Sequence, residues 1–220
     1  MGVFPHLHTV KTMIFNNLRA TLPLLLLCLI ACNRVGDGFT PEELALINGA
    51  DSIMRVLTID NPADSAVLRA QSIDLPAEAL LSADFERLAE LMLATVNHPS
   101  QNGVGIAGPQ VGINRRVVAV QRYDKEPVEC NGVVDHPFEV YPNVQIVWAS
   151  DSLAAGPEGC LSVPNRRGEV MRSQEIVIEY ASKDGDEQIK MATDTIKGFT
   201  AVIFQHEIDH LEGTLYIDRL

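Results

Sequence analysis

Apolar residues recur at helical spacing in two well-separated segments of the chain. The first runs from Asp84 to Val96, with Ser82 placed to cap its start and Pro99 placed to end it. Its apolar stripe consists of Phe85, Leu88, Leu91, Met92 and Val96. The second segment runs from Phe199 to Leu211. The pattern therefore predicts two amphipathic helices.

Between these helices the pattern is that of short strands separated by turn residues. β-rich sequence concentrates in four runs, 116–121, 140–148, 175–181 and 187–193. The segment Lys183-Asp184-Gly185-Asp186 between the last two is typical of a hairpin turn. Because helices packed on mainly antiparallel strands make an α+β fold, we expect short, mainly antiparallel strands around a central C-terminal helix.

The segment before the first of these helices carries weaker signals. Thr40-Pro41-Glu42-Glu43 offers a capping residue, a proline at the first helical position and a glutamate at the third, which predicts a short helix to about Ile47. Met54 to Ile59 is predicted as a strand. Pro62 to Leu68 is predicted as a loop, because it mixes a proline with acids and small residues.

The first 32 residues have the pattern of an export signal. Leu22 to Ala31 is an apolar run of ten residues preceded by Arg19, and it is shorter than the roughly 17–25 residues that span a bilayer. The segment 29–32, Leu-Ile-Ala-Cys, resembles the lipobox of bacterial lipoproteins, which implies cleavage before Cys32 and lipid on that residue. The alternatives are an uncleaved anchor and a misassigned start, with Met13 as the true one.

The chain is strongly acidic, with a formal net charge of −12. Such a surface repels phosphate backbones, so we expect no nucleic acid as a partner. Arg166, Arg167 and Arg172 lie close together in the sequence and leave room for a local basic patch.

His206-Glu207-Ile208-Asp209-His210 has the H-E-x-x-H pattern and lies in the second predicted helix. Residues four apart on a helix share a face, so both imidazoles can reach one metal ion. Glu207 lies beside them without having to bind the metal, as a general base requires. The pentapeptide alone is only moderately specific, because many helices carry these residues in this order without a metal.

A third metal ligand is expected upstream of this helix. Only ten residues follow His210, and Tyr216 stands where the metzincin pattern needs a histidine. Cys160 is the strongest candidate, because one thiolate and two imidazoles leave a fourth position open for water, as in catalytic zinc sites. The alternative is a disulfide between Cys130 and Cys160; otherwise Cys130 is a small apolar residue or a free thiol.

Three separated segments share their pattern with one known family. Residues 103–110 read GVGIAGPQ, 158–162 read EGCLS and 205–211 read QHEIDHL. They resemble the G-x-G-x-A-A-x-Q, E-G-C-L-S and Q-H-E-x-D-H-L motifs of the peptide deformylases, in the same order, and the similarity extends from about Met54 to Leu220. The resemblance implies a metal-dependent hydrolase that removes the N-formyl group from the formylmethionine of newly made polypeptides or formyl peptides.

The resemblance also implies roles for the residues in these motifs. A metal-bound water attacks the formyl carbon, with Glu207 as general base and then general acid. The Gln110 side-chain amide and the Leu161 backbone N–H donate to the oxygen on which negative charge grows. Taken alone, Gln110 would be a polar loop residue bonded to a neighbouring strand. One divalent metal is held by Cys160, His206 and His210; the family often uses iron(II), and zinc, nickel and cobalt fit the same ligands.

The glycine motif is expected to hold the substrate. In the family this segment pairs with the substrate peptide as an added strand, and Gly103 and Gly105 leave room for that approach. Val104, Ile106 and Val202 are candidate walls of the pocket for the methionine side chain. They are equally candidate core residues, above all Ile106.

The cysteine motif is expected to have supporting residues. Arg167 is predicted to face the substrate backbone, and Glu158 and Arg172 are predicted to form an ion pair that braces the segment. The sequence departs from the family at Gly108, where alanine is usual, and at Tyr141, which precedes Pro142 where asparagine is often found.

The chain is therefore divided into a signal peptide (1–32), a tether with the start of a helix (33–44) and one metallohydrolase domain (45–220). We expect a monomer, anchored to the bacterial cell envelope through lipid on Cys32; the alternative location is the cytoplasm. Two other functions remain open: a zinc protease with unusual ligands, and a lipoprotein that binds metal or peptide without catalysis.

Overall fold

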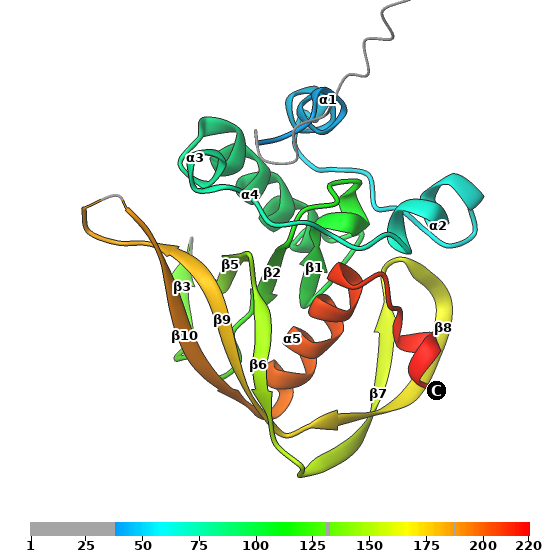
Figure 1. The fold of residues 1–220 in the computed structure, drawn as a ribbon. Helices are drawn as coiled ribbons and strands as arrows, with labels where there is room; N and C mark the ends of the chain where they lie inside the picture. Colours follow the sequence, from blue (N-terminus) through cyan, green and yellow to red (C-terminus); the bar gives the residue numbers. More distant parts are fainter. Residues whose placement is uncertain (1–37, 131–132, 187) are drawn as a thin grey trace, which may run out of the picture. The chain divides into compact units, whose positions relative to one another are not determined.

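Helix α5 (Gly198–Leu211) is the element on which the sheets converge in the computed structural model (Figure 1). The structure describes residues 38–130, 133–186 and 188–220, which lie within one unit, Val35–Leu220. Ten of the fourteen residues of α5 are buried, so the predicted C-terminal helix is confirmed as a core helix rather than a surface one.

Short antiparallel strands contact α5 from several sides. One sheet has the order β1-β2-β5, with β1 Gly105–Ala107, β2 Val117–Gln121 and β5 Phe138–Pro142. The other has the order β10-β9-β6, with β6 Gln145–Ala149, β9 Glu175–Lys183 and β10 Ile189–Lys197. Two ribbons complete them: β3 Val128–Cys130 with β4 Val133–Asp135, and β7 Leu153–Cys160 with β8 Val163–Ser173. Every pair of these strands is antiparallel, which confirms the α+β class.

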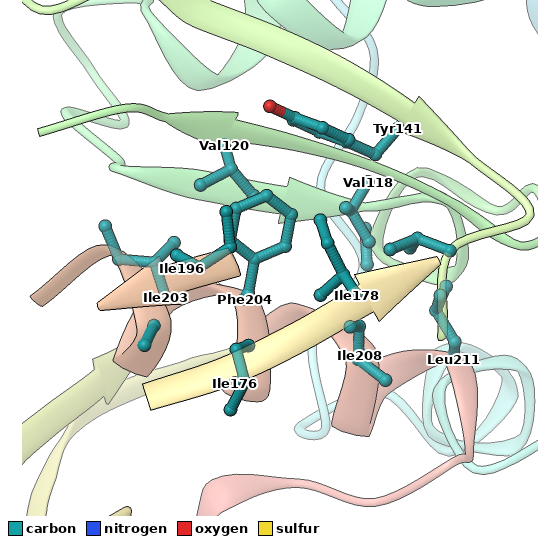
Figure 2. Close-up of a cluster of buried hydrophobic side chains, with 13 residues drawn as sticks. Val118, Val120, Tyr141, Ile176, Ile178, Ile196, Ile203, Phe204, Ile208 and Leu211 are labelled. Carbon is teal, nitrogen blue, oxygen red and sulfur yellow. The ribbon is translucent and has the colours of Figure 1, made fainter. Parts of the chain in front are cut away.

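A core of thirteen buried residues joins α5 to both three-stranded sheets (Figure 2). The Phe204 ring of α5 packs with Val118 and Val120 of β2 and with Ile176 and Ile178 of β9. Burying an apolar side chain of this size contributes about 1.5–3 kcal/mol. Phe204 lies within one turn of His206 and Glu207 on the same helix, so this packing fixes where the backbone of these two residues lies.

From residue 38 onward, four helices precede the first sheet: α1 Pro41–Gly49, α2 Pro62–Leu68, α3 Ala77–Leu80 and α4 Ala83–Val96. The capping box predicted for α1 is confirmed, since the Thr40 and Glu43 side chains each accept from the other's backbone N–H. The Ser82 cap of α4 is confirmed too, since its hydroxyl accepts from the Phe85 N–H. Two 3-10 helices also occur, η1 Gly108–Val111 and η2 Tyr216–Arg219.

Two predictions for the N-terminal part are wrong. Met54 to Ile59 belongs to no strand and ends in a turn. Leu57 donates to the Gln110 carbonyl and Ile59 to the Ser162 carbonyl, and neither of these carbonyls lies in a strand ladder. Pro62 to Leu68 is helix α2 rather than a loop. Asn61 caps this helix with its side-chain oxygen, and proline stands at its first position.

The strand predictions needed two further corrections. The run 140–148 is interrupted at Asn143, whose φ of +52° turns the chain between β5 and β6. The Asn143 side chain accepts from the Leu75 N–H and donates to its carbonyl, which stabilises the turn. The ribbon β7–β8 was not predicted at all, because its glycines, prolines and charged residues hide the strand alternation.

The predictions for the signal peptide, Cys32 and most of the tether fall outside the described residues. Within the part that the structure describes, none of the helices combines the length and apolar character needed to cross a bilayer.

Candidate active site

The predicted ligands Cys160, His206 and His210 come together at one point. One candidate ligand atom from each lies within 4.8 Å of the others, and Cys160 Sγ is 3.2 Å from His210 Nε2. Both histidines project from the same face of α5, while Cys160 ends β7. Cys160 is a free thiol, so the alternative of a disulfide with Cys130 is wrong. A thiol and two imidazoles that converge in this way fit a divalent metal such as zinc or iron(II).

Glu158 holds His206 in position. Its Oε2 lies 2.7 Å from His206 Nδ1, so this nitrogen donates to the carboxylate and the other ring nitrogen remains available as a ligand. The same carboxylate accepts two hydrogen bonds from Arg172, at 2.7 and 3.0 Å, which confirms the predicted ion pair. Burial opposes ionisation of Glu158, but the hydrogen bonds from His206 and Arg172 outweigh it and hold its pKa at about 2.

The support for His206 continues beyond this ion pair. Arg172 also donates to Asp209 of α5 at 2.6 Å, and Asp209 accepts a two-pronged contact from Arg219 of η2. Arg172 and Asp209 are buried. The chain of contacts thus runs from the C-terminal turn through Asp209, Arg172 and Glu158 to a candidate metal ligand.

His210 is held without such a partner. Its side chain is completely enclosed, and its Nδ1 atom has no hydrogen-bond partner among the described residues. Burial, together with the positive charges of Arg172 and Arg69, lowers the pKa of His210 well below the ordinary value. His210 is therefore neutral at physiological pH, which is the form of imidazole that binds a metal.

Glu207 is buried beside the ligands. One of its carboxylate oxygens, Oε2, has no hydrogen-bond partner in the described structure. Burial raises the pKa of Glu207 to about 7. A carboxyl group that titrates near neutral pH suits the transfer of protons in both directions.

Gly105 leaves the space that Glu207 occupies. A Cβ atom at this position would lie 2.5 Å from Glu207 Oε1 and 2.8 Å from Ile203 Cγ2. Atoms this close overlap, so any larger residue at position 105 would displace the carboxylate. This close approach is a second reason for the glycine, besides the room for substrate that the sequence suggested.

Gln110 is oriented by its neighbours. Its side-chain oxygen accepts from the Ala107 N–H at 2.8 Å, so its NH₂ group must point the other way, toward Ser162 Oγ at 3.2 Å and Cys160 Sγ at 3.5 Å. The reading of Gln110 as bonded to a neighbouring strand is thus correct for its oxygen. The amide nitrogen, however, faces the candidate metal ligands.

A cavity of about 800 Å³ opens onto these groups. All the residues predicted for substrate binding line it: Gly103, Val104, Gly105, Arg167 and Val202. Gln110, Leu161, Cys160, His206 and Glu207 line it as well, whereas His210 does not. Ile106 is completely buried in the core against α4, so for this residue the alternative reading is correct.

The cavity also contains residues that the sequence analysis did not select, among them Phe199, Ile203, Asn165 and Arg166. Phe199 was open to prediction, because it lies three residues before Val202 and seven before His206, on the same face of the helix. Asn165 and Arg166 belong to the ribbon β7–β8, which was not predicted; Arg166 was named only as part of a possible basic patch, and Asn165 carried no signal.

Comparisons with known proteins point to one family. The family model described as polypeptide deformylase matches residues 53–220. The peptide deformylase of Leptospira biflexa is 34% identical over 169 residues, which covers 77% of this chain and 88% of that protein. That of Roseiflexus castenholzii is 35% identical over 175 residues, which covers 76% and 89%.

Solved structures extend the agreement to the fold. A peptide deformylase of Acinetobacter baumannii with bound Met-Ala-Ser has a TM-score of 0.63 and 32% identity, covering 76% of this chain and 98% of its own. The peptide deformylase of Thermotoga maritima has a TM-score of 0.62 and 27% identity, covering 77% and 99%.

Proposed function

Because the chain belongs to the polypeptide deformylase family, we propose that Glu207 is the residue that moves protons in the reaction of that family. The chain is a metal-dependent hydrolase that removes the N-formyl group from newly made polypeptides. The observation that carries the proposal is the Glu207 carboxylate, which is buried, has an oxygen without a partner among the described groups, and lines the cavity beside Cys160 and His206.

Cys160, His206 and His210 would hold the metal. When bound there, a divalent metal lowers the pKa of water to about 7 and polarises the formyl oxygen. Iron(II) is the metal proposed from the family, and zinc, nickel and cobalt fit the same donors. An oxidising compartment would favour zinc, because a thiolate on iron(II) is prone to oxidation.

Glu207 takes a proton from the attacking water and later returns it to the leaving amine. Its pKa of about 7 lets the same carboxyl group accept and donate at neutral pH. Gly105 keeps the carboxylate in place, because its lack of a side chain leaves the space that Oε1 fills.

Gln110 and Leu161 stabilise the negative charge that grows on the formyl oxygen. The Gln110 NH₂ group faces the cavity because its oxygen is engaged with the Ala107 N–H. Leu161 follows Cys160 directly and lines the same cavity, so its backbone N–H is the second donor proposed. Losing one such donor typically costs about 2.7–4 kcal/mol of transition-state stabilisation.

The test is deformylation of formyl-Met-Ala-Ser by the purified full chain, loaded in turn with iron(II), zinc or nickel, and with elemental analysis of the isolated protein. Glu207→Gln keeps the size of the side chain but cannot accept a proton, so it should retain metal and lose turnover. Wild type without turnover in any metal form would leave a metal- or peptide-binding protein. Cleavage of unformylated internal peptide bonds would favour a protease.

We also propose that the enzyme is anchored to the bacterial cell envelope by lipid on Cys32 and acts there as a monomer on formyl peptides or nascent chains. The support is the ten-residue apolar run Leu22 to Ala31 with Cys32 directly after it, so that residues 29–32 read Leu-Ile-Ala-Cys. Labelling of cells with a palmitate analogue should mark the wild-type chain and not Cys32→Ser. Equal labelling, or recovery of both proteins in the cytoplasmic fraction, would refute the anchor.

A further inference from the structure

Two arginines at the active-site cavity differ from every other arginine in the described part of the chain. Arg166 and Arg167 are exposed, and neither takes part in an ion pair among the described residues. Each of the others takes part in at least one ion pair: Arg55, Arg69, Arg87, Arg115, Arg116, Arg122, Arg172 and Arg219.

The backbone of the β7–β8 ribbon carries both arginines toward the cavity. Glu158 pairs with Gly168 and Cys160 with Val163, so a single residue of β7 faces the four residues 164–167 of β8. The surplus residues bulge out of the ladder, with Asn165 at a φ of +60°. The Arg167 stem lies over Gly159, where a Cβ atom would be 3.6 Å from Arg167 Cγ.

The bulge therefore places positive charge close to the reacting groups. Gly159, under Arg167, is the residue directly before Cys160. Arg166 and Arg167 are the only arginine or lysine residues among those that line the cavity in the described structure. The two carboxylates of the lining are already committed, since Glu158 binds Arg172 and His206, and Glu207 stands beside the candidate metal ligands.

This positive charge contrasts with the rest of the protein. The chain has a formal net charge of −12, so an acidic substrate would be repelled by most of the surface. A guanidinium group presents a planar set of donors that matches a carboxylate and binds it more strongly than it binds a neutral acceptor. Two such groups without internal partners form a local site for a negative group.

We propose that Arg166 and Arg167 select formyl peptides that carry a carboxylate within the first few residues after methionine. This inference rests on the proposed function, since it concerns the substrate of the same cavity. The carboxylate has two possible sources, an aspartate or glutamate side chain and the free C-terminus of a short formyl peptide.

The experiment compares matched formyl peptides by kcat/KM on the full-length, metal-loaded enzyme. Formyl-Met-Asp-Ala-amide against formyl-Met-Asn-Ala-amide tests the side chain, and formyl-Met-Ala-Ser against its C-terminal amide tests the free carboxylate. We expect a preference of about three- to tenfold for the charged peptide in at least one pair at low salt. Raising the salt to 1 M should reduce it, because the screening length falls to about 3 Å.

In the double variant Arg166→Gln/Arg167→Gln, the ratio of kcat/KM for the charged peptide to that for its neutral match should fall to about one. The control Arg87→Gln removes a positive charge from α4, away from the cavity, and should retain the wild-type ratio. A ratio near one in the wild type for both pairs would overturn the proposal, and so would a preference that survives in the double variant.

A second measurement separates this inference from the proposed function. Calorimetry measures binding of the product peptides to the same proteins and needs no turnover. The charged and neutral peptides are again compared in pairs: Met-Asp-Ala-amide with Met-Asn-Ala-amide, and Met-Ala-Ser with its C-terminal amide. Tighter binding of a charged form that depends on the two arginines supports the inference even if deformylation fails. Equal binding of charged and neutral forms overturns it even if deformylation succeeds.

Discussion

The Nδ1 atom of His206 lies 2.7 Å from Oε2 of Glu158, and this one contact links a candidate metal ligand to a buried network of charges. Glu158 in turn accepts from Arg172, and Arg172 donates to Asp209. The orientation of the imidazole is therefore determined by residues of β7, β8 and α5 together. Because these contacts involve charged groups, substituting one residue of the network changes the electrostatic environment of the next.

Glu158→Gln should weaken metal binding while leaving the three ligands in place. The amide cannot accept the His206 proton as strongly as the carboxylate, and loss of such a partner typically costs 10- to 100-fold in metal affinity. Competition with a chromophoric chelator measures this affinity. Glu169→Gln on the neighbouring strand is the matched control, because Glu169 is exposed and should leave the affinity unchanged. Equal affinities of wild type and Glu158→Gln would contradict the prediction.

Gly105→Ala should reduce kcat more than tenfold while the chain stays folded. The added methyl group would lie 2.5 Å from Glu207 Oε1, so the carboxylate must move away from the position that it needs for proton transfer. Gly49→Ala is the control, since a Cβ at Gly49 meets nothing within 4 Å. Circular dichroism checks the fold and steady-state kinetics the activity. Unchanged kcat in Gly105→Ala would show that the displacement does not matter.

Asp209→Asn should destabilise the protein more than Arg219→Gln. Asp209 is the shared partner of Arg172 and Arg219, so the substitution leaves the buried Arg172 with Glu158 as its remaining carboxylate partner. The weakened hydrogen bond to a buried charged group should cost about 1.5–3 kcal/mol. Arg219 is partly exposed, with 45% of its side chain accessible, so its loss should cost about 1 kcal/mol or less. Urea unfolding of both variants measures the difference. The reverse order would mean that the network is not organised around Asp209.

The stability of the protein should fall as the pH drops below about 4.5. Burial opposes ionisation of Asp124 and Glu139, but hydrogen bonds from Arg122 to Asp124 and from Lys125 to Glu139 hold both pKa values below the ordinary ones. The folded state therefore binds fewer protons than the unfolded state, and the stabilisation present above the ordinary pKa values is lost on acidification.

Urea midpoints of the wild type between pH 7 and pH 3 measure this loss. The variant Asp124→Asn/Glu139→Gln removes both titrating groups and should show a shallower dependence on pH. Asp51→Asn, which removes an exposed carboxyl group that forms no ion pair among the described residues, should follow the wild type. Identical slopes for the double variant and the wild type would exclude the contribution of this cluster.

Local spacing in the sequence was enough to predict the helix caps and the side chains that share a face of the C-terminal helix. The H-E-x-x-H pair lies on one helical face because residues four apart are neighbours on any helix. The caps at Thr40 and Ser82 were equally local and were confirmed. Cys160 was chosen from its motif, and the structure places its sulfur with the two imidazoles.

Other features of the fold and the site depend on partners distant in the sequence, so they became visible only in the folded structure. Met54 to Ile59 was predicted as a strand. The N–H groups of Leu57 and Ile59 instead donate to the carbonyls of Gln110 and Ser162, and no local sequence pattern predicts these partners. The direction of the Gln110 side-chain amide is likewise set by its partners in the fold, because its oxygen accepts from the Ala107 N–H and its nitrogen donates to Ser162 Oγ. Arg166 and Arg167 have no ion pair among the described residues, and this too depends on the fold, because carboxylates distant in the sequence pair with other arginines such as Arg69 and Arg115. Local sequence determines which conformation a segment prefers, whereas a charge or an amide takes its role from what the folded chain brings within a few ångströms of it.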